Sequence, residues 1–382
     1  MANEGPRSKE AREVTLDPWG TVEVKDYNRL LKVFGIRPFN EVLPLLEKAG
    51  MKPSFHMKRG IIFGHRDFDK VLEAKARGEP VAVLTGFMPS GRFHFGHKMT
   101  VDQLIYLQNS GFKIFIVIAD AEASIVRRIP RREAIRIGVE EYIASMIALG
   151  LDPKKTEFYF QTNRGTSYYR LIQLFSGKIT TAEMEAIYGD ISPSKVIAAL
   201  TQAADILHVQ LEEYGGYKWV VVPVGADQDP HLRLTRDIAD RVSDIIKLTR
   251  PASTYHRLQR GLDGGKMSSS RPDYTIFLTD EPRIARMKLM KALTGGRATA
   301  EEQRRLGGVP EACTVFDMDK YHLMQDEDEL SSIYSSCRKG ALLCGECKLI
   351  AWSKLEKFLY EYKKRLEKAR DIAWSIVDTP KF

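Results

Sequence analysis

The chain has 382 residues, of which 43% are hydrophobic and 28% are charged. This length predicts two or three domains, and the composition excludes a disordered chain, a collagen and a membrane protein. No apolar run approaches the roughly 18 residues of a membrane-spanning helix, and the charged start of the chain is unlike a signal peptide. We therefore expect a cytoplasmic protein without a membrane partner.

Basic residues outnumber acidic ones by 58 to 50, which gives a formal net charge of +8. This excess mildly favours a polyanionic partner such as nucleic acid, although a soluble protein can be basic without such a partner. Four cysteines are too few for a disulfide scaffold. All of them lie late in the chain, at Cys313, Cys337, Cys344 and Cys347.

The first 79 residues have a mixed pattern, and we assign residues 1–79 to an N-terminal extension. Residues 17–20 indicate a turn, and residues 28–34 and 39–49 show the apolar spacing of helices. Residues 59–67 form a short apolar run that ends in polar side chains. A short helix is predicted over residues 68–76.

From Pro80 onward, short buried strands alternate with helices. Continuous apolar runs predict strands at 81–84, 114–118 and 219–224. Helices are expected at 97–110, roughly 131–150, roughly 168–210 and 230–242. This alternation is typical of βαβ units on a parallel sheet. We predict an α/β fold with a Rossmann-like, parallel-sheet catalytic domain at 80–285, which contains a helical insertion at about 125–200.

After about residue 282 no further strand is expected. Apolar residues from Leu355 onward recur at positions 358, 359, 362, 366, 369 and 373. They form one face of a long amphipathic helix, whose charged face is most simply a solvated surface. We assign residues 286–382 to an all-helical C-terminal domain.

The first predicted strand leads into a segment rich in glycine and histidine, residues 85–97. Ligands bind at the carboxyl ends of strands in open parallel sheets, and helix N-termini favour phosphate. Gly86 and Gly96 permit close approach of the backbone to a ligand. His94 and His97 are placed to donate hydrogen bonds to phosphate oxygens. A metal-binding pair or two structural histidines are the alternatives.

A second glycine-rich loop, residues 261–270, carries one lysine and three hydroxyl groups. Lys266 would hold a polyphosphate by its charge, and Ser268, Ser269 and Ser270 would donate short hydrogen bonds to it. A merely flexible loop is the alternative.

Together these two segments resemble the HIGH and KMSKS signatures of class I aminoacyl-tRNA synthetases, as His94-Phe-Gly-His97 and Lys266-Met-Ser-Ser-Ser270. They flank the predicted parallel-sheet domain. Residues 224–230, which follow the third predicted strand, look like the GxDQ loop of the tyrosyl and tryptophanyl subgroup.

Over nearly its whole length the chain is similar to tryptophanyl-tRNA synthetases of the archaeal and eukaryotic type. The segments that carry this resemblance are Asp17-Pro-Trp-Gly20, Arg59 to Asp67, Gln202-Ala-Ala204, Asp227-Gln-Asp-Pro230, Thr235-Arg-Asp237, Ile276-Phe-Leu-Thr-Asp280, Gly295-Gly-Arg297 and Arg305-Leu-Gly-Gly308. The resemblance implies a tryptophan–tRNA ligase of protein synthesis that is a homodimer. It also implies that residues 286–382 bind the anticodon of the tRNA.

The implied reaction has two steps, in which positioning and charge stabilisation dominate. The carboxylate of tryptophan attacks the α-phosphorus of ATP, with Mg²⁺, and the tryptophanyl group then passes to the terminal ribose of its tRNA. The catalytic residues implied are His94, His97, Lys266, Ser268 and Ser270. The ATP-binding residues implied are Gly86, Gly96, Asp227, Lys266, Met267, Ser268 and Ser269.

The tryptophan-binding residues implied by the resemblance are Leu84, Glu122, Gln202, Asp205 and Gln228. Tyrosine enzymes of archaeal type share the acidic residue at Asp205 but have a tyrosine where Leu84 stands, and eukaryotic tryptophan enzymes also have a tyrosine near that position. An indole offers only a hydrogen-bond donor, so a carboxylate is its sensible partner. Glu122 and Asp205 both remain candidates, and Glu122 is otherwise a surface or helix-cap carboxylate.

Two other functions are open at this point. A tyrosyl-tRNA synthetase is favoured by Asp205 and disfavoured by Leu84, and a non-catalytic RNA-binding relative would have damaged signature loops.

The resemblance further implies that residues 65–67 cover the ATP site. A basic patch consists of Arg127, Arg128, Arg131 and Arg132. It suits the tRNA backbone or is simply a solvated face.

The four cysteines have the spacing C-x23-C-x6-C-x2-C, which is plausible for a site of metal-bound thiolates. Some tryptophanyl-tRNA synthetases carry a four-cysteine iron–sulfur motif of nearly this spacing in the same helical domain, with a first spacer one residue shorter. A [4Fe–4S] cluster is the first hypothesis, and zinc, disulfides and free thiols are the alternatives. Such a cluster would order the anticodon-reading surface and take no part in catalysis.

Overall fold

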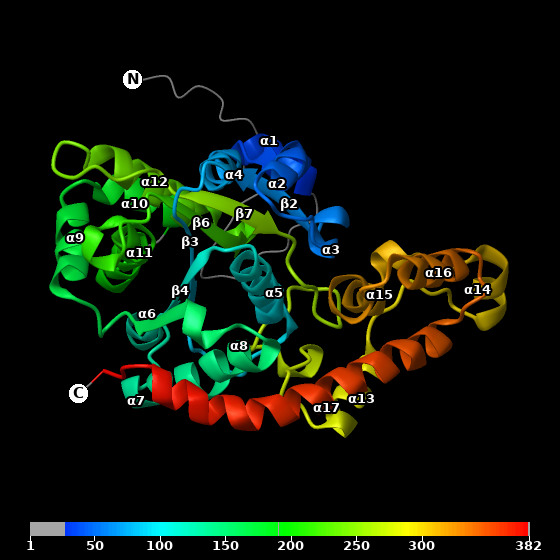
Figure 1. The fold of residues 1–382 in the computed structure, drawn as a ribbon. Helices are drawn as coiled ribbons and strands as arrows, with labels where there is room; N and C mark the ends of the chain where they lie inside the picture. Colours follow the sequence, from blue (N-terminus) through cyan, green and yellow to red (C-terminus); the bar gives the residue numbers. More distant parts are fainter. Residues whose placement is uncertain (1–26, 190, 381–382) are drawn as a thin grey trace, which may run out of the picture. The chain divides into compact units, whose positions relative to one another are not determined.

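The computed structural model describes residues 27–189 and 191–380 (Figure 1). The turn expected at residues 17–20 lies outside the described residues. The chain forms two compact units, each built from two separate stretches. Unit 1 comprises Met1–Thr85 and Gly165–Arg257, and unit 2 comprises Gly86–Arg164 and Leu258–Phe382. The predicted domain boundaries, at residues 79/80 and 285/286, differ from the boundaries of these two units. The division into three domains stays a prediction.

Unit 1 holds a mixed sheet. Its strands follow one another across the sheet as β1 (Arg37–Pro38), β2 (Ile62–Arg66), β7 (Ala252–His256), β6 (Trp219–Gly225) and β3 (Val81–Phe87). The pairs β3–β6 and β6–β7 are parallel, whereas β1–β2 and β2–β7 are antiparallel. The predicted strands at 81–84 and 219–224 are confirmed, and the N-terminal extension adds two antiparallel strands to them.

The helices of unit 1 pack on this sheet and on one another. An apolar cluster that includes Tyr168, Phe175, Leu207 and Ile238 is surrounded by α9 (Thr166–Ser176), α10 (Thr181–Tyr188), α11 (Pro193–Leu207) and α12 (Asp229–Arg241) (Figure 1). The predicted helices at 28–34, 68–76 and 230–242 are confirmed within one or two residues. The helical segments of unit 1 are α1 (Tyr27–Phe34), η2 (Phe39–Val42), α2 (Leu43–Lys48), α3 (Phe55–Lys58), α4 (Phe68–Ala76), α9 (Thr166–Ser176), α10 (Thr181–Tyr188), α11 (Pro193–Leu207), η5 (His208–Gln210), η6 (Glu212–Tyr214), η7 (Ala226–Gln228) and α12 (Asp229–Arg241).

Unit 2 contains two parallel strands and a large set of helices. β4 (Lys113–Ile118) pairs with β5 (Thr156–Phe160), and Ile114 lies opposite Thr156. β4 was expected, whereas β5 interrupts a region expected to be helical. The helical segments of unit 2 are α5 (Phe95–Asn109), α6 (Asp120–Ile125), α7 (Arg131–Ile137), η3 (Gly138–Ile143), α8 (Ala144–Leu149), η4 (Pro153–Lys155), η8 (Pro272–Tyr274), α13 (Pro282–Lys291), α14 (Ala300–Leu306), η9 (Pro310–Ala312), α15 (Thr314–Met318), η10 (Asp319–Leu323), α16 (Glu327–Arg338) and α17 (Cys344–Ile376).

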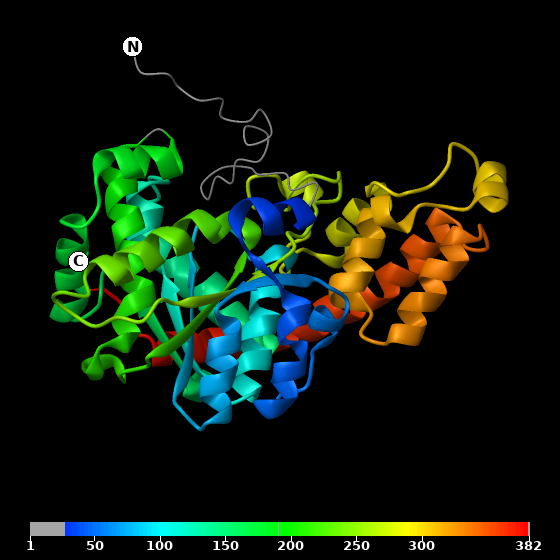
Figure 2. The ribbon, with the colours of Figure 1, turned by 90° about the horizontal axis from the view of Figure 1, so that it is seen from above.

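The last helix, α17, is 33 residues long and runs beside α8 (Figures 1 and 2). Its buried face includes Leu355, Leu359, Tyr362 and Leu366, as the apolar spacing predicted. Within unit 2, α15, α16 and the first turns of α17 form a separate group of helices (Figure 2). In the part of the chain that the structure describes, no strand follows β7 and no helix has the length and apolarity to cross a membrane.

These pairings confirm the predicted α/β class. Parallel strands alternate with helices along the chain, and the C-terminal part is helical. The predicted signature loops follow this framework, because the segment after β3 leads into α5 and the loop at 261–270 follows β7.

Candidate functional site

The two histidines of the first signature form the start of α5. His94 is the N-cap residue, and its Nδ1 accepts a hydrogen bond from the N–H of Gly96 at 3.1 Å. In return, Nδ1 of His97 accepts from the N–H of His94 at 3.2 Å. This reciprocal arrangement satisfies backbone donors that a helix start leaves without a partner. Because each Nδ1 acts as an acceptor, a neutral ring carries its proton on Nε2 as a donor.

Both imidazole rings are held by packing. They stack on each other with centroids 3.8 Å apart, and His97 also contacts the ring of Tyr142 at 5.2 Å. A Cβ at Gly96 would lie 2.9 Å from Cε1 of His94, so only glycine fits between the two histidines. Steric crowding by the His94 ring thus explains why this position of the signature is a glycine.

The electrostatic environment links the two signatures within unit 2. Burial, followed by the charge of Lys266, lowers the pKa of His97 to about 3. Burial, followed by the charges of His97 and Lys266, lowers the pKa of His94 well below its usual value. At neutral pH both rings are therefore uncharged Nε2–H donors, and Lys266 lies within electrostatic range of both.

The second signature loop also contacts the first directly. The hydroxyl of Ser269 donates to the backbone oxygen of Arg92 at 3.1 Å. His94 forms an isolated antiparallel bridge with Phe277, which follows the loop. The structure thus brings together the two segments that the sequence singled out.

Within the loop, backbone contacts fix the residues around Lys266. The N–H of Met267 donates to the oxygen of Gln259 at 2.9 Å, and the Met267 side chain is buried. The hydroxyls of Ser268 and Ser270 lie 2.9 Å apart, and Ser270 is exposed. These positions leave the serine hydroxyls at or near the surface, where a ligand can reach them.

Arg92 belongs to this region, although sequence reasoning did not select it. Its guanidinium lies over the ring of Phe277 at 4.4 Å. It donates to Thr279 at 3.0 Å and pairs with Asp280, whose carboxylate also accepts from Lys288 at 2.7 Å. The segment 276–280, noticed only through a family resemblance, therefore anchors the first signature.

Two further predicted residues of unit 2 are Gly86, near the end of β3, and Glu122, in α6 after β4. A Cβ at Gly86 would approach the side chain of Val117 to 2.9 Å, so the close packing of strands explains this glycine. Glu122 lies in α6 with its side chain half-buried, and its N–H donates to Gln161 Oε1 at 3.3 Å. Its assignment to tryptophan stays a prediction.

In unit 1, the predicted tryptophan-binding residues occupy β3 and α11. Leu84 is fully buried in β3, and Gln202 is half-buried in α11. Asp205 is buried, and its carboxylate accepts a hydrogen bond from the hydroxyl of Tyr168 at 2.7 Å. Sequence reasoning missed Tyr168, because no local pattern links it to a carboxylate one helix away.

Asp227 and Gln228 lie in η7, the short turn between β6 and α12. Asp227 is buried and Gln228 is half-buried. The next residue, Asp229, accepts from Nε of Arg66 at 2.9 Å and from the hydroxyl of Tyr255 at 2.5 Å. These contacts fix the end of the turn that carries both predicted binding residues, Asp227 and Gln228.

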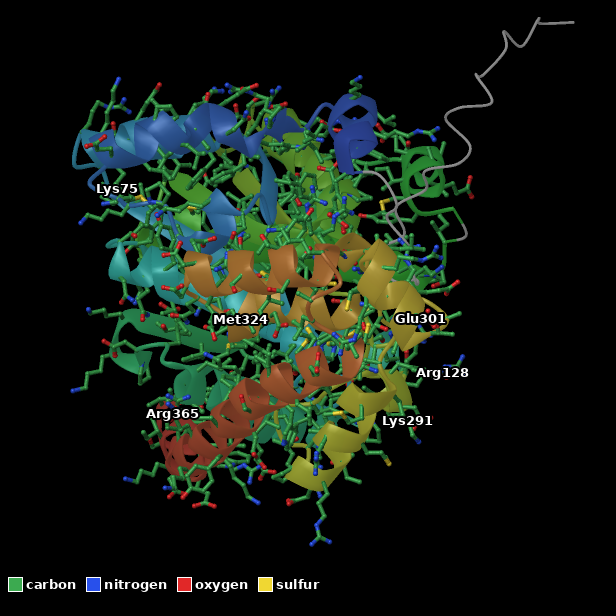
Figure 3. All side chains as sticks on the ribbon, turned by 90° about the vertical axis from the view of Figure 1, so that its right-hand side faces the viewer. Lys75, Arg128, Lys291, Glu301, Met324 and Arg365 are labelled. Carbon is green, nitrogen blue, oxygen red and sulfur yellow. The ribbon has the colours of Figure 1, made fainter. Side chains whose placement is uncertain are left out.

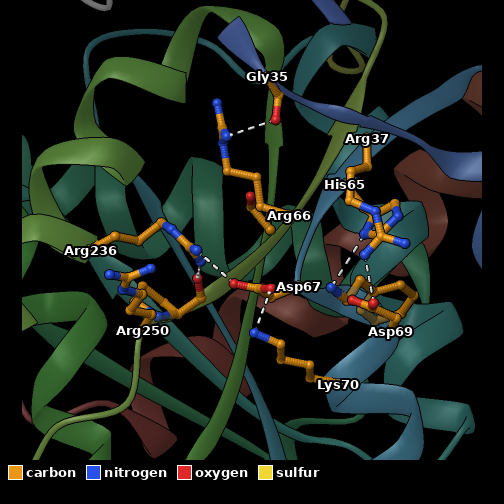
Figure 4. A network of polar contacts seen from close by, with 12 residues as sticks. Gly35, Arg37, His65, Arg66, Asp67, Asp69, Lys70, Arg236 and Arg250 are labelled. Atoms are coloured by element: carbon orange, nitrogen blue, oxygen red, sulfur yellow. Dashed lines mark hydrogen bonds and ion pairs between the residues drawn. The ribbon is translucent and has the colours of Figure 1, made fainter.

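Residues 65–67 take part in a polar network inside unit 1 (Figure 4). Asp67 has a left-handed backbone conformation with φ of 50°. Its carboxylate pairs with Arg236 at 2.6 Å and with Lys70 at 2.9 Å. Arg66 donates to the backbone oxygen of Gly35 at 3.1 Å. The expected role of this segment in covering ATP stays a prediction.

The four cysteines line one cavity in unit 2. Its other walls are largely apolar and include Val315, Phe316, Ile333 and Leu342. The cysteines are not joined by disulfides. Among residues 27–189 and 191–380, no three or more His, Cys, Asp or Glu side chains are arranged so that they could already hold a metal ion.

The four thiols also influence one another electrostatically. Burial, followed by the charge of the neighbouring thiols, raises the pKa of Cys337. Burial, followed by Asp319 and the neighbouring thiols, raises the pKa of Cys347. Burial also raises the pKa of Cys313, whose sulfur accepts from the N–H of Phe316 at 3.5 Å.

The basic patch lies around the start of α7. Arg127, Arg128 and Arg132 are exposed. Arg131 is less exposed and lies 3.9 Å from the carboxylate of Asp120. Three of the four predicted side chains are thus accessible to a polyanion.

Comparisons with known proteins agree with this geometry. Residues 75–360 match the family described as tRNA synthetases class I (W and Y). The chain is 76% identical to the tryptophan–tRNA ligase of Aeropyrum pernix, over 96% of this chain and 99% of the relative. It is 62% identical to the tryptophan–tRNA ligase of Hyperthermus butylicus, with the same coverage.

Solved structures show the same similarity. The crystal structure of tryptophanyl-tRNA synthetase from Aeropyrum pernix superposes with a TM-score of 0.92, covering 96% of this chain and all of that chain. The tryptophanyl-tRNA synthetase of Plasmodium falciparum is 26% identical, with a TM-score of 0.82 and coverage of 92% of this chain and 96% of that chain.

Proposed function

This chain belongs to the class I tRNA synthetases for tryptophan and tyrosine, and from that premise we propose that it is a tryptophan–tRNA ligase. It activates L-tryptophan with ATP to tryptophanyl-adenylate and transfers the tryptophanyl group to its tRNA. The observation that carries this proposal is the 76% identity to a tryptophan–tRNA ligase over nearly the whole chain. The contacts between the HFGH and KMSSS segments of unit 2 also support this proposal.

In the first step, a carboxylate oxygen of tryptophan forms a bond to the α-phosphorus. The bond from that phosphorus to the β-phosphate oxygen breaks, and pyrophosphate leaves with the electron pair. His94 and His97 donate Nε2–H bonds to phosphate oxygens, and Lys266 adds a positive charge. Ser268 and Ser270 supply further donors. Such groups act best where charge builds up in the transition state.

The other ATP contacts come from backbone and loop positions. The backbone at Gly86 and Gly96 approaches the phosphates, and Met267 and Ser269 complete the loop around Lys266. Asp227 meets the ribose or the amino group of the substrate. Mg²⁺ is commonly held through substrate phosphates with few protein ligands, and it neutralises phosphate charge when it binds with ATP.

Recognition of tryptophan rests on five residues. Gln202 and Gln228 bind the polar end of the amino acid, and Leu84 packs beside its side chain. Glu122 or Asp205 accepts the indole N–H. Asp205 already accepts from Tyr168, and a carboxylate has room for a further donor.

ATP–pyrophosphate exchange tests the function. We expect exchange with tryptophan and a rate at least about 100-fold lower with tyrosine, because unpaired polar groups in the site penalise the wrong amino acid. Exchange with tyrosine alone would instead identify a tyrosyl-tRNA synthetase. No exchange with any amino acid would favour a non-catalytic RNA-binding relative.

The same assay separates the two indole acceptors. Replacing the true acceptor should raise the KM for tryptophan by about 10-fold or more, because a hydrogen bond to a charged group is lost. Glu122→Gln and Asp205→Asn form the matched pair. An unchanged KM in both variants would reject both residues.

We also propose that Cys313, Cys337, Cys344 and Cys347 hold a [4Fe–4S] cluster. The four residues fit the group, because all of them line one cavity with apolar walls and a backbone N–H already points at one sulfur. When bound, the cluster would cross-link α15, α16 and α17 through these thiolates. It would order this helical part for anticodon binding and leave amino-acid activation to other residues.

Iron analysis checks the cluster. Protein purified without oxygen should be brown, should absorb broadly in the visible range and should carry about four iron atoms per chain. Cys337→Ser should lose most of this colour. A colourless wild-type protein would contradict the cluster, and one zinc ion per chain in its place would identify the zinc alternative.

Further partners follow from the family and the charge. The exposed arginines at 127, 128 and 132 contact the tRNA backbone, and residues 286–382 read the anticodon. Two copies of the chain form a homodimer in the cytoplasm. A particle with the 43.4 kDa mass of one chain in sedimentation experiments would contradict the dimer.

A further inference from the structure

Two glycine pairs, Gly295–Gly296 and Gly307–Gly308, have no task in the proposed reaction. The first glycine of each pair packs against backbone. A Cβ at Gly295 would lie 1.8 Å from the oxygen of Val309, and one at Gly307 would lie 1.8 Å from a backbone oxygen. Gly307 also has a φ of +69°, which disfavours side chains. Both positions therefore require glycine.

The second glycine of each pair faces a cysteine sulfur of the cavity. A Cβ at Gly296 would lie 2.8 Å from Sγ of Cys344, and a Cβ at Gly308 would lie 2.8 Å from Sγ of Cys337. The N–H of Gly308 donates to the backbone oxygen of Cys337 at 2.8 Å. The two glycine pairs thus form a close wall around two of the four sulfurs.

The amide of Gln303 lies between these glycines. Gln303 is in α14, next but one to Glu301, which Figure 3 labels. Its Oε1 is 3.1 Å from the Gly296 Cβ position, and its Nε2 is 2.9 Å from the Gly308 Cβ position. The Gly308 position therefore has the Cys337 sulfur on one side and the Gln303 amide nitrogen on another.

The orientation of this amide is fixed by one hydrogen bond. Oε1 of Gln303 accepts from the N–H of Arg297 at 2.9 Å, which places Nε2 toward Gly308. The side chain is 3% exposed, yet Nε2 has no hydrogen-bond partner in the part of the chain that the structure describes. A buried amide donor without an acceptor is rare and calls for an explanation.

We propose that Gln303 donates its Nε2–H to the sulfur of Cys337 when that sulfur is a thiolate bound to the [4Fe–4S] cluster. A neutral thiol is a weak hydrogen-bond acceptor. A metal-bound thiolate carries negative charge and is therefore a stronger acceptor for the Nε2–H of Gln303. Hydrogen bonds to the sulfurs help set the reduction potential of such clusters. Gln303 is thus a positioning residue of the cluster, and the glycine pairs make room for it. The inference rests on the proposed cluster.

The test compares isosteric changes at Gln303 by reduction potential and by cluster loss in air. Gln303→Glu replaces the donor with an acceptor of the same shape, and should shift the midpoint potential to more negative values. It should also speed iron loss by about 10-fold, the scale of such outer contacts. Gln303→Leu should shift the potential in the same direction by less, because it adds no charge.

A matched glycine control lies beside the ligands. A Cβ at Gly345, between Cys344 and Cys347, would meet no atom within 4 Å, so Gly345→Ala should keep the potential and iron content of the wild type. Gly308→Ala should lower the iron content. Wild-type potential and iron loss in both Gln303 variants would overturn this inference alone. A wild-type protein without iron would overturn the cluster and this inference together.

Discussion

Replacing His94 by Asn is expected to slow tryptophan-dependent exchange by about 10²- to 10³-fold, the loss typical of one transition-state donor. The asparagine oxygen can take over the cap bond to Gly96, because Asn is a good N-cap residue. The variant therefore loses the Nε2–H donor and keeps the helix start. His94→Ala loses both groups and should also unfold more easily. Exchange kinetics and thermal unfolding, measured together, separate the two effects.

The pH dependence offers a second readout of the same site. The pKa of His97 is about 3, so the ring stays neutral through pH 6.5, and kcat/KM should show no histidine limb there. The unfolded chain binds this proton near pH 6.5. Stability should therefore fall as the pH falls from about 6.5 toward 3. A limb near pH 6.5 that disappears in His94→Asn would refute neutral imidazoles.

Apolar patterning predicted the elements whose burial comes from their own aliphatic side chains. β3, β4 and β6 each contain a continuous apolar run (VAVL, IFIVI and WVVVPV), and the later part of α17 repeats its apolar residues at helical spacing. β7 escaped prediction because its sequence, ASTYH, is polar although all five residues are buried. Its burial depends on partners such as Asp229, which accepts from Tyr255. Such partners lie outside any local window.

The candidate site shows the same division. The signature loops predicted that His94 and Lys266 belong to one site. The structure places these two side chains within electrostatic range of each other. The cap bonds that fix the donor nitrogen of each ring depend on three-dimensional geometry. The same holds for Arg92 and Gln303, whose partners are distant in sequence or brought together only by packing.

The start of α17 differs from its prediction for a related reason. The helix begins at Cys344, eleven residues before the first apolar position used to predict it. Its first turns face a cavity lined by cysteines, so the regular aliphatic spacing is missing there. The cysteine-lined cavity thus explains why apolar spacing alone predicts a later start for this helix.

Breaking the buried ion pair between Arg66 and Asp229 should strongly destabilise unit 1. The Asp229 side chain is fully buried and that of Arg66 is 14% exposed. Arg66→Met would leave the carboxylate with the Tyr255 hydroxyl but without its countercharge. We expect the free energy of unfolding to fall by about 3–5 kcal/mol, as for other buried pairs that lose one partner. Guanidinium unfolding measures this change.

The double variant Arg66→Met/Asp229→Asn shows whether charge is the cause. It removes both charges and should be more stable than Arg66→Met alone, so the two changes should be non-additive by more than about 0.5 kcal/mol. Arg136→Gln is the control, because Arg136 and Glu133 form an exposed pair worth under about 1 kcal/mol. Equal effects of Arg66→Met and Arg136→Gln would contradict the buried pair. Since Asp229 directly follows Asp227 and Gln228, a rise in the KM for tryptophan should accompany the loss of stability in Arg66→Met and be absent in Arg136→Gln.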